Sequence, residues 1–200
     1  MIQGVIFDVG GVLVRTHDQS GRRTWEARYA MQPGDLARLV FDSELGRQCQ
    51  LGRAAAHELW SWVGSRLGLD ADGLASLKRD FWAGDRVDQE LCDTIRRLRA
   101  RYRTGMLSNT WSYDGRAMAE KFGFADCFDA FVTSAQVGVM KPDPRIYRII
   151  LERLEVEPPA AVFVDDFVEN VEGARRLGMR AVHFVDPIHG RRELEELLSE

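Results

Sequence analysis

The 200-residue sequence predicts an α/β fold, in which helices flank a parallel β-sheet and a small helical domain is inserted after the first strand. From residue 88 onward, short apolar runs alternate with helical patterns, as a parallel sheet with right-handed crossovers requires. Between residues 24 and 85, apolar residues recur at helical spacing and no strand pattern interrupts them. An apolar run at residues 5–7 precedes both regions and predicts the first strand.

The first strand leads directly into Asp8, and Gly10 and Gly11 follow closely. Open α/β sheets bind ligands at the carboxyl ends of their strands, so we expect Asp8 at a ligand site. The glycines allow a sharp turn and bring backbone N–H groups close to a ligand. Taken alone, the motif fits equally well with an alternative interpretation, in which Asp8 only caps a loop.

The inserted region follows a polar stretch at residues 15–23, which predicts an exposed loop. Leu59, Val63 and Leu67 recur at helical spacing, and Asp70 marks the start of another helix. Its aromatic residues are expected to pack the insert rather than to bind a cofactor. They are Trp25, Trp60, Trp62, Phe81 and Trp82.

The remaining elements follow in strict alternation. Pro142 and Pro144 predict a turn and a helix start, and Gly178 predicts a helix end. The expected order is helix 88–101, strand 104–107, helix 111–122, strand 130–133, helix 145–154, strand 161–164, a helix that stops near residue 178, strand 181–184 and a charged C-terminal helix.

Polar groups gather at the predicted strand ends, and parallel strands present those ends at one edge of the sheet. The groups are Asp8, Ser108, Asn109, Lys141, Asp165 and Asp166. Carboxylates suit Mg²⁺, which keeps several waters and needs few protein ligands. A lysine and a hydroxyl suit a phosphoryl group, which Asp8 could attack as a nucleophile. The alternative, purely structural interpretations are that Ser108 and Asn109 cap a helix and that Lys141 is a solvated loop residue.

The segments FDVGGVL, LSNT, GVMKPDPRIY and VFVDDFVENVEGARRLGM resemble the four signature motifs of the haloacid dehalogenase (HAD) superfamily. Within it, the sequence most resembles small phosphatases with a helical cap, such as the glucose-1-phosphate phosphatase type and the phosphatase domain of soluble epoxide hydrolase. The resemblance implies a Rossmann-like, HAD-like core at residues 1–16 and 86–200 and a helical cap at residues 17–85.

The resemblance also implies roles for the site residues. Asp8 matches the nucleophile, and the ligands of Mg²⁺ match Asp8, the carbonyl of Gly10 and Asp166. Lys141 matches the charge clamp. The residues that bind the phosphoryl group are expected to be Ser108, Asn109, Gly11 and Lys141. Asp165 and Asn170 match supports for the lysine and the metal shell, so that the catalytic set is Asp8, Lys141, Ser108 and Asp165.

One position departs from the pattern that this resemblance implies. Most phosphatases of the superfamily carry a second Asp two residues after the nucleophile, as general acid and base. That position is Gly10 here. Its carbonyl can bind Mg²⁺, but no side chain can move a proton, and His17 and Asp18 are the first candidates for a substitute. The glucose-1-phosphate type also resembles this sequence in having Gly there.

The amino-acid composition limits the kinds of binding partner that the protein can have. The net charge of −4 gives no general attraction to nucleic acid or to an anionic membrane, and no apolar run is long enough to span a bilayer. The three cysteines lack metal spacing and predict free thiols in a reducing cytoplasm. We expect a small phosphorylated metabolite as partner, neither nucleic acid nor membrane, and the sequence leaves the oligomeric state open.

The sequence is compatible with four functions. The first is a Mg²⁺-dependent phosphatase that forms an aspartyl-phosphate on Asp8 and acts on a small metabolite such as a sugar phosphate. The second is a haloacid dehalogenase, whose Asp attacks carbon without a metal; the doubled acid at Asp165 and Asp166 counts against it. The third is a non-catalytic phospho-ligand binding protein, suggested by Gly10. The fourth is a response-regulator receiver, against which the late position of the acidic pair counts.

Overall fold

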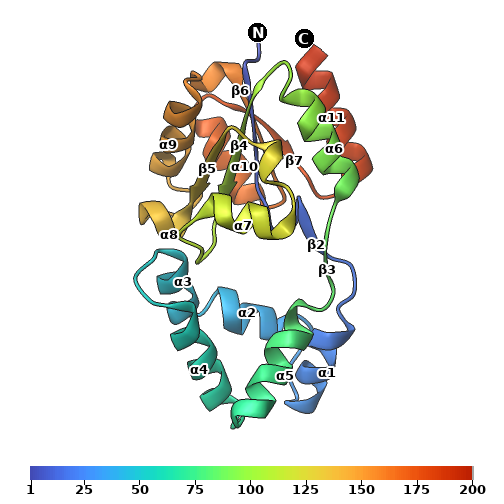
Figure 1. The fold of residues 1–200 in the computed structure, drawn as a ribbon, viewed down its shortest axis with the longest axis vertical. Helices are drawn as coiled ribbons and strands as arrows, with labels where there is room; N and C mark the ends of the chain where they lie inside the picture. Colours follow the sequence, from blue (N-terminus) through green and yellow to red (C-terminus); the bar gives the residue numbers. More distant parts are fainter. Residues whose placement is uncertain (200) are drawn as a thin grey trace.

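The computed structural model describes residues 1–199 and has at its centre a five-stranded parallel sheet in the order β5-β4-β1-β6-β7 (Figure 1). The strands are β1 (Gly4–Phe7), β4 (Arg103–Ser108), β5 (Ala130–Thr133), β6 (Ala161–Asp165) and β7 (Arg180–His183). Every pairing in this sheet is parallel. The predicted α/β class is therefore confirmed.

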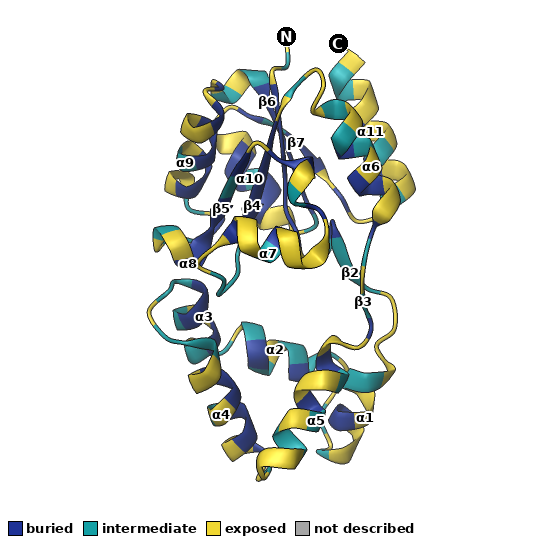
Figure 2. Ribbon diagram, viewed as in Figure 1, coloured by how far each residue is buried: buried dark blue, intermediate teal, exposed yellow. Residues whose placement is uncertain are grey.

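Helices cover both faces of the sheet, whose strands are mostly buried (Figure 2). One face packs against α6 (Gln89–Leu98), α7 (Gly115–Phe122), the short 3₁₀-helix Ala125–Cys127 and α11 (Pro187–Ser199). The other packs against α9 (Pro144–Leu154) and α10 (Val168–Arg176). Successive strand residues point to opposite faces, so Phe7 joins the first core and Ile6 the second.

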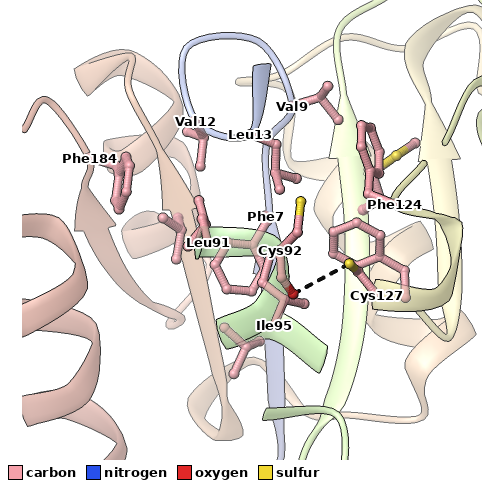
Figure 3. Close-up of a cluster of buried hydrophobic side chains, with 14 of the residues drawn as sticks. Phe7, Val9, Val12, Leu13, Leu91, Cys92, Ile95, Phe124, Cys127 and Phe184 are labelled. Atoms are coloured by element: carbon pink, nitrogen blue, oxygen red, sulfur yellow. Dashed lines mark hydrogen bonds between the residues drawn. The ribbon is translucent and has the colours of Figure 1, made fainter. Parts of the chain in front are cut away.

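The first core holds two of the three cysteines (Figure 3). The thiol of Cys127 donates a hydrogen bond to the carbonyl of Cys92 across 3.6 Å. All three cysteines are buried and free, as the sequence predicts.

Residues 17–84, inserted after the first strand, form five helices with a hydrophobic core of their own. They are α1 (Ser20–Arg28), α2 (Asp35–Phe41), α3 (Glu44–Gln50), α4 (Ala56–Arg66) and α5 (Ala71–Trp82). The side chains of Ser43 and Asp70 accept backbone N–H groups at the starts of α3 and α5. The predicted helical insert is present: Trp25, Trp60 and Phe81 are buried in this core and Trp62 packs against it, whereas Trp82 stays exposed.

A two-stranded antiparallel ribbon joins the helical insert to the sheet domain, and the sequence interpretation missed it. β2 (Val14–Thr16) pairs with β3 (Asp85–Val87), where only a loop and a helical region had been expected. Each strand has three residues, too few to show a period, and the partners lie about seventy positions apart. The proposed division at residues 16 and 86 falls inside this ribbon.

One predicted helix begins late. The pattern predicts a helix from residue 111, but α7 begins at Gly115, because the side chain of Asp114 accepts the N–H of Ala117 and so caps the helix there. Residues 109–114 instead form a loop at the carboxyl end of β4. Among residues 1–199, no helix is both long and apolar enough to cross a membrane.

Candidate active site

Four charged side chains from distant parts of the chain meet at the carboxyl edge of the sheet. Asp8 follows β1, while Asp165 ends β6 and Asp166 follows it. The ammonium of Lys141 lies 2.7 Å from Oδ1 of Asp8 and 2.6 Å from Oδ2 of Asp165. It also donates to the carbonyl of Leu107 across 3.0 Å. All three donated contacts are buried, so Lys141 bridges β1, β4 and β6.

The position of Lys141 is fixed by Asn109. The amide oxygen of Asn109 accepts the N–H of Lys141 at 2.9 Å, and its amide nitrogen donates to the carbonyl of Lys141 at 3.1 Å. Both functional atoms of this side chain are thus used to hold the lysine's backbone. These contacts are those of a residue that positions Lys141, and the expected role of Asn109 in binding a phosphoryl group stays a prediction.

Asp165 is saturated with hydrogen bonds. One oxygen accepts the N–H of Phe167 at 2.8 Å, the other faces Lys141, and the amide of Asn170 lies 3.0 and 3.1 Å from the two oxygens. The hydroxyl of Tyr147 in turn donates to the carbonyl of Asn170 at 2.8 Å. Asn170 therefore supports Asp165, and Asp165 supports Lys141. Tyr147 was not singled out from the sequence, although it lies inside the motif GVMKPDPRIY.

The carboxylates of Asp8, Asp165 and Asp166 offer oxygens that all lie within 4.8 Å of one another. Their situations differ, because Asp165 already has partners at both oxygens, whereas Oδ1 of Asp166 is buried and has no hydrogen-bond partner. A buried, orphaned carboxylate oxygen is costly unless a cation or a proton compensates for it. Asp8 and Asp166 are therefore better placed than Asp165 to act as ligands of a hard divalent cation such as Mg²⁺.

The electrostatics of the site agree with this fit. Burial raises the pKa of Asp8 to about 7, outweighing the attraction of Lys141, and the other two carboxylates raise it further. Burial also raises the pKa of Asp166 to about 6, with repulsion from Asp165 as the second cause. Burial alone would lower the pKa of Lys141, but the charges of Asp8 and Asp165 raise it above its ordinary value. Lys141 is therefore charged, and its single positive charge does not balance the negative charge of three carboxylates.

The glycine pair plays two separate parts. Gly11 adopts a φ of +80°, and a Cβ on it would lie 2.0 Å from Oδ2 of Asp166. Its N–H donates to the carbonyl of Val14 at 2.9 Å, and the expected contact of Gly11 with a phosphoryl group stays a prediction. The site needs a residue without a side chain at this position, because any Cβ would collide with Asp166. Gly10 is exposed, and a Cβ on it would meet nothing within 4 Å.

The remaining candidates lie at the same edge or outside it. Ser108 is buried at the last position of β4, where it pairs in register with Thr133 of β5. His17 is exposed just beyond the ribbon, and its N–H donates to the carbonyl of Gly84. The structure does not bring His17 into contact with the acidic cluster.

The fold and this edge define a class: an α/β protein whose sheet gathers a buried lysine and three carboxylates at the ends of its strands. Haloacid dehalogenase-like hydrolases match residues 2–178, and the chain belongs to that family. A sesquiterpene phosphatase of Aspergillus oryzae is 28% identical over 200 residues, covering 98% of this chain and 97% of that protein. A D-ribitol-5-phosphate phosphatase of Bacteroides thetaiotaomicron is 27% identical over 210 residues, covering 100% of both.

Among solved structures, a HAD family enzyme from Bacteroides thetaiotaomicron, a variant in complex with magnesium and inorganic phosphate, superposes with a TM-score of 0.72. It is 20% identical and covers 90% of this chain and 93% of its own, so the likeness is one of fold. The chain is thus a HAD-like hydrolase with phosphatases among its relatives, and the resemblance seen in the sequence motifs is confirmed.

Proposed function

We propose that this hydrolase is a Mg²⁺-dependent phosphatase that cleaves phosphoric monoesters through an aspartyl-phosphate on Asp8. The observation that carries the proposal is the contrast between the two acids after β6. Lys141, Asn170 and a backbone N–H occupy Asp165, while Asp166 keeps an orphaned oxygen beside Asp8. Such an arrangement leaves a place for a cation next to a carboxylate nucleophile.

Asp8 would attack phosphorus with one carboxylate oxygen, and the bond between phosphorus and the ester oxygen would break. Lys141 holds the other side of that carboxylate and carries a fixed positive charge toward the incoming phosphoryl oxygens. Asp8 and Asp166, with the carbonyl of Gly10, would hold Mg²⁺, which when bound supplies further positive charge to the phosphoryl group. Ser108 offers a hydroxyl donor at the same edge. Water would then hydrolyse the phosphorylated Asp8.

We further propose that residues 17–85 act as a cap, which the ribbon of β2 and β3 hinges against the core. The substrate would be a small phosphorylated metabolite, as the names of the full-length relatives suggest for those proteins. The three free, buried thiols support a reducing compartment such as the cytoplasm.

A haloacid dehalogenase is the second candidate, because its chemistry uses the same position for the nucleophile. The orphaned oxygen of Asp166 favours the phosphatase, since attack on carbon needs no metal. Release of inorganic phosphate from 4-nitrophenyl phosphate, with Mg²⁺ and with EDTA, tests the proposal, and chloride release from 2-chloropropionate tests the alternative. We expect Mg²⁺-dependent phosphate release only. Chloride release, or phosphate release that EDTA leaves intact, would refute the proposal.

A further inference from the structure

Three aromatic side chains meet where the helical insert touches the core, and we call them the aromatic face: Phe41, Trp82 and Trp111. Phe41 ends α2 and Trp82 ends α5, whereas Trp111 comes from the core loop at residues 109–114. Trp111 stacks on Phe41 with ring centroids 5.6 Å apart and 13° between the planes. It meets Trp82 edge-on at 6.1 Å. Trp82 keeps 39% of its surface exposed.

The aromatic face lies beside the candidate active site. Trp111 is two residues beyond Asn109, so the Cα atoms of these two residues are at most about 7 Å apart. The side chain of Asn109 in turn holds the backbone of Lys141. The hydroxyl of Tyr113, in the same loop, donates to the carbonyl of Gly52 just beyond α3. In Figure 1 the loop before α7 extends from the sheet toward α3. The insert therefore presents apolar rings at the carboxyl end of β4.

Apolar rings in that place select a particular kind of leaving group. Flat aromatic groups gain from offset or edge-on contact with indole and phenyl rings beyond the area that they bury. A half-exposed tryptophan such as Trp82 can gain such a contact without disturbing the packed core of the insert.

The proton chemistry of the site points the same way. Asp165 is saturated, Asp8 is the proposed nucleophile, and Asp166 is the proposed cation ligand. Gly10 has open space where a side chain could stand and supplies no acid. A departing oxygen must then leave without a proton from these residues. A phenolic oxygen, whose conjugate acid has a pKa of about 10, leaves far more easily than an alkoxide about as basic as hydroxide.

We propose that the substrates are aryl phosphates, monoesters of a phenolic hydroxyl, whose ring packs against Phe41, Trp82 and Trp111. This inference rests on the proposed phosphatase function and names the substrate class for it. Asp8 forms the new bond to phosphorus, and the bond from phosphorus to the phenolic oxygen breaks. The aryloxide leaves with that electron pair and takes a proton from water. Hydrolysis of the phosphorylated Asp8 by a second water then gives inorganic phosphate and restores the proton balance.

Three substrates test the inference on the intact enzyme with Mg²⁺. 1-Naphthyl phosphate has the aromatic ring and the weakly basic leaving group. Cyclohexyl phosphate has a smaller, saturated ring and a strongly basic leaving group, and acetyl phosphate has a good leaving group without a ring. We expect kcat/KM for 1-naphthyl phosphate to exceed that for cyclohexyl phosphate by at least a hundredfold and that for acetyl phosphate by at least tenfold. Equal values for the naphthyl and acetyl esters, or for the naphthyl and cyclohexyl esters, would overturn the inference.

Variants locate the ring contact. Trp82→Ala and Trp111→Ala should each lower the ratio of kcat/KM for the naphthyl ester to that for acetyl phosphate by about tenfold, and Trp82→Phe should restore most of it. Trp62→Ala removes a partly buried tryptophan from another part of the insert and should leave that ratio unchanged. An unchanged ratio in both aromatic-face variants overturns the inference. Failure to hydrolyse acetyl phosphate as well as the esters would instead refute the phosphatase function itself.

Discussion

Gly11→Ala separates the backbone cost of a substitution from its effect on the proposed metal site. Gly11 has a φ of +80°, and placing a side chain in this left-handed region costs about 1–2 kcal/mol. In addition, the new Cβ would lie 2.0 Å from Oδ2 and 2.3 Å from Cγ of Asp166. The carboxylate must move by roughly 1 Å or more to reach ordinary contact. Metal ligands hold their distances to within about 0.2 Å, so Asp166 would lose its place as a ligand.

The matched control is Gly123→Ala. Gly123 has a φ of +79°, and a Cβ on it would meet nothing within 4 Å. Urea denaturation should show that Gly123→Ala loses about 1–2 kcal/mol of unfolding free energy and that Gly11→Ala loses at least as much, because its Cβ also displaces Asp166. Only Gly11→Ala should also raise the Mg²⁺ concentration needed for half-maximal phosphatase activity, by about 10–100-fold, the range seen when support of a metal ligand is lost. Equal Mg²⁺ requirements in the two variants would refute the assignment of Asp166 as a ligand.

Four further predictions follow from the same geometry. Asp8→Asn should abolish phosphate release while the fold is retained, because an amide is a poor nucleophile; a substantial residual rate in a preparation free of deamidation would exclude Asp8 as nucleophile. Asp166→Ala should raise the Mg²⁺ requirement more than Asp165→Ala, whereas Asp165→Ala should lower the melting temperature more because it removes one of the two carboxylates that pair with buried Lys141; the reverse ranking would mean that the pair is misassigned. Without metal, the folded protein binds more protons than the unfolded chain, because the pKa of Asp8 is raised to about 7 and that of Asp166 to about 6. Stability should therefore fall as pH rises from about 4 to 7, and Mg²⁺ should raise the melting temperature more at pH 8 than at pH 5, since it binds deprotonated carboxylates; an equal or larger shift at pH 5 would contradict this. Finally, substrate held by Asp8→Asn should slow hydrogen exchange in residues 17–85, and unchanged exchange at saturating ligand would count against a closing cap.

The sheet and the placement of the charged groups follow from local patterns. Each apolar run is short and buried, and the polar residue that ends it must lie at the same edge as the others in a parallel sheet. That reasoning needs no distances, and the structure does bring Asp8, Lys141, Asp165 and Asp166 together. The helical insert is equally visible, because its apolar residues repeat at 3.6-residue spacing over many turns.

The contacts made by each polar atom could not be predicted in the same way. The amide of Asn109 meets the backbone of a residue 32 positions away, and the N–H of Gly11 meets a carbonyl only three positions away. Both groups are generic hydrogen-bonding groups, and sequence alone does not say whether a ligand or the chain itself will use them. The ribbon of β2 and β3 escaped notice because strands of three residues carry no readable period.

The hydrogen bonds of Asn109 and Gly11 indicate how the chain holds the charge of the site. Asn109 holds the backbone of Lys141, and the N–H of Gly11 donates to a carbonyl of its own turn. We therefore propose that a phosphoryl oxygen is bound chiefly by the ammonium of Lys141, the hydroxyl of Ser108 and the proposed cation. Lys141 contacts two carboxylates in the ligand-free site, and its backbone is held on both sides by one amide. Its charge is therefore fixed in place before substrate arrives, which is the preorganisation that stabilises a developing negative charge. In the proposed mechanism the site depends on a lysine whose backbone Asn109 holds, and variants of Asn109 should impair turnover as positioning mutations do.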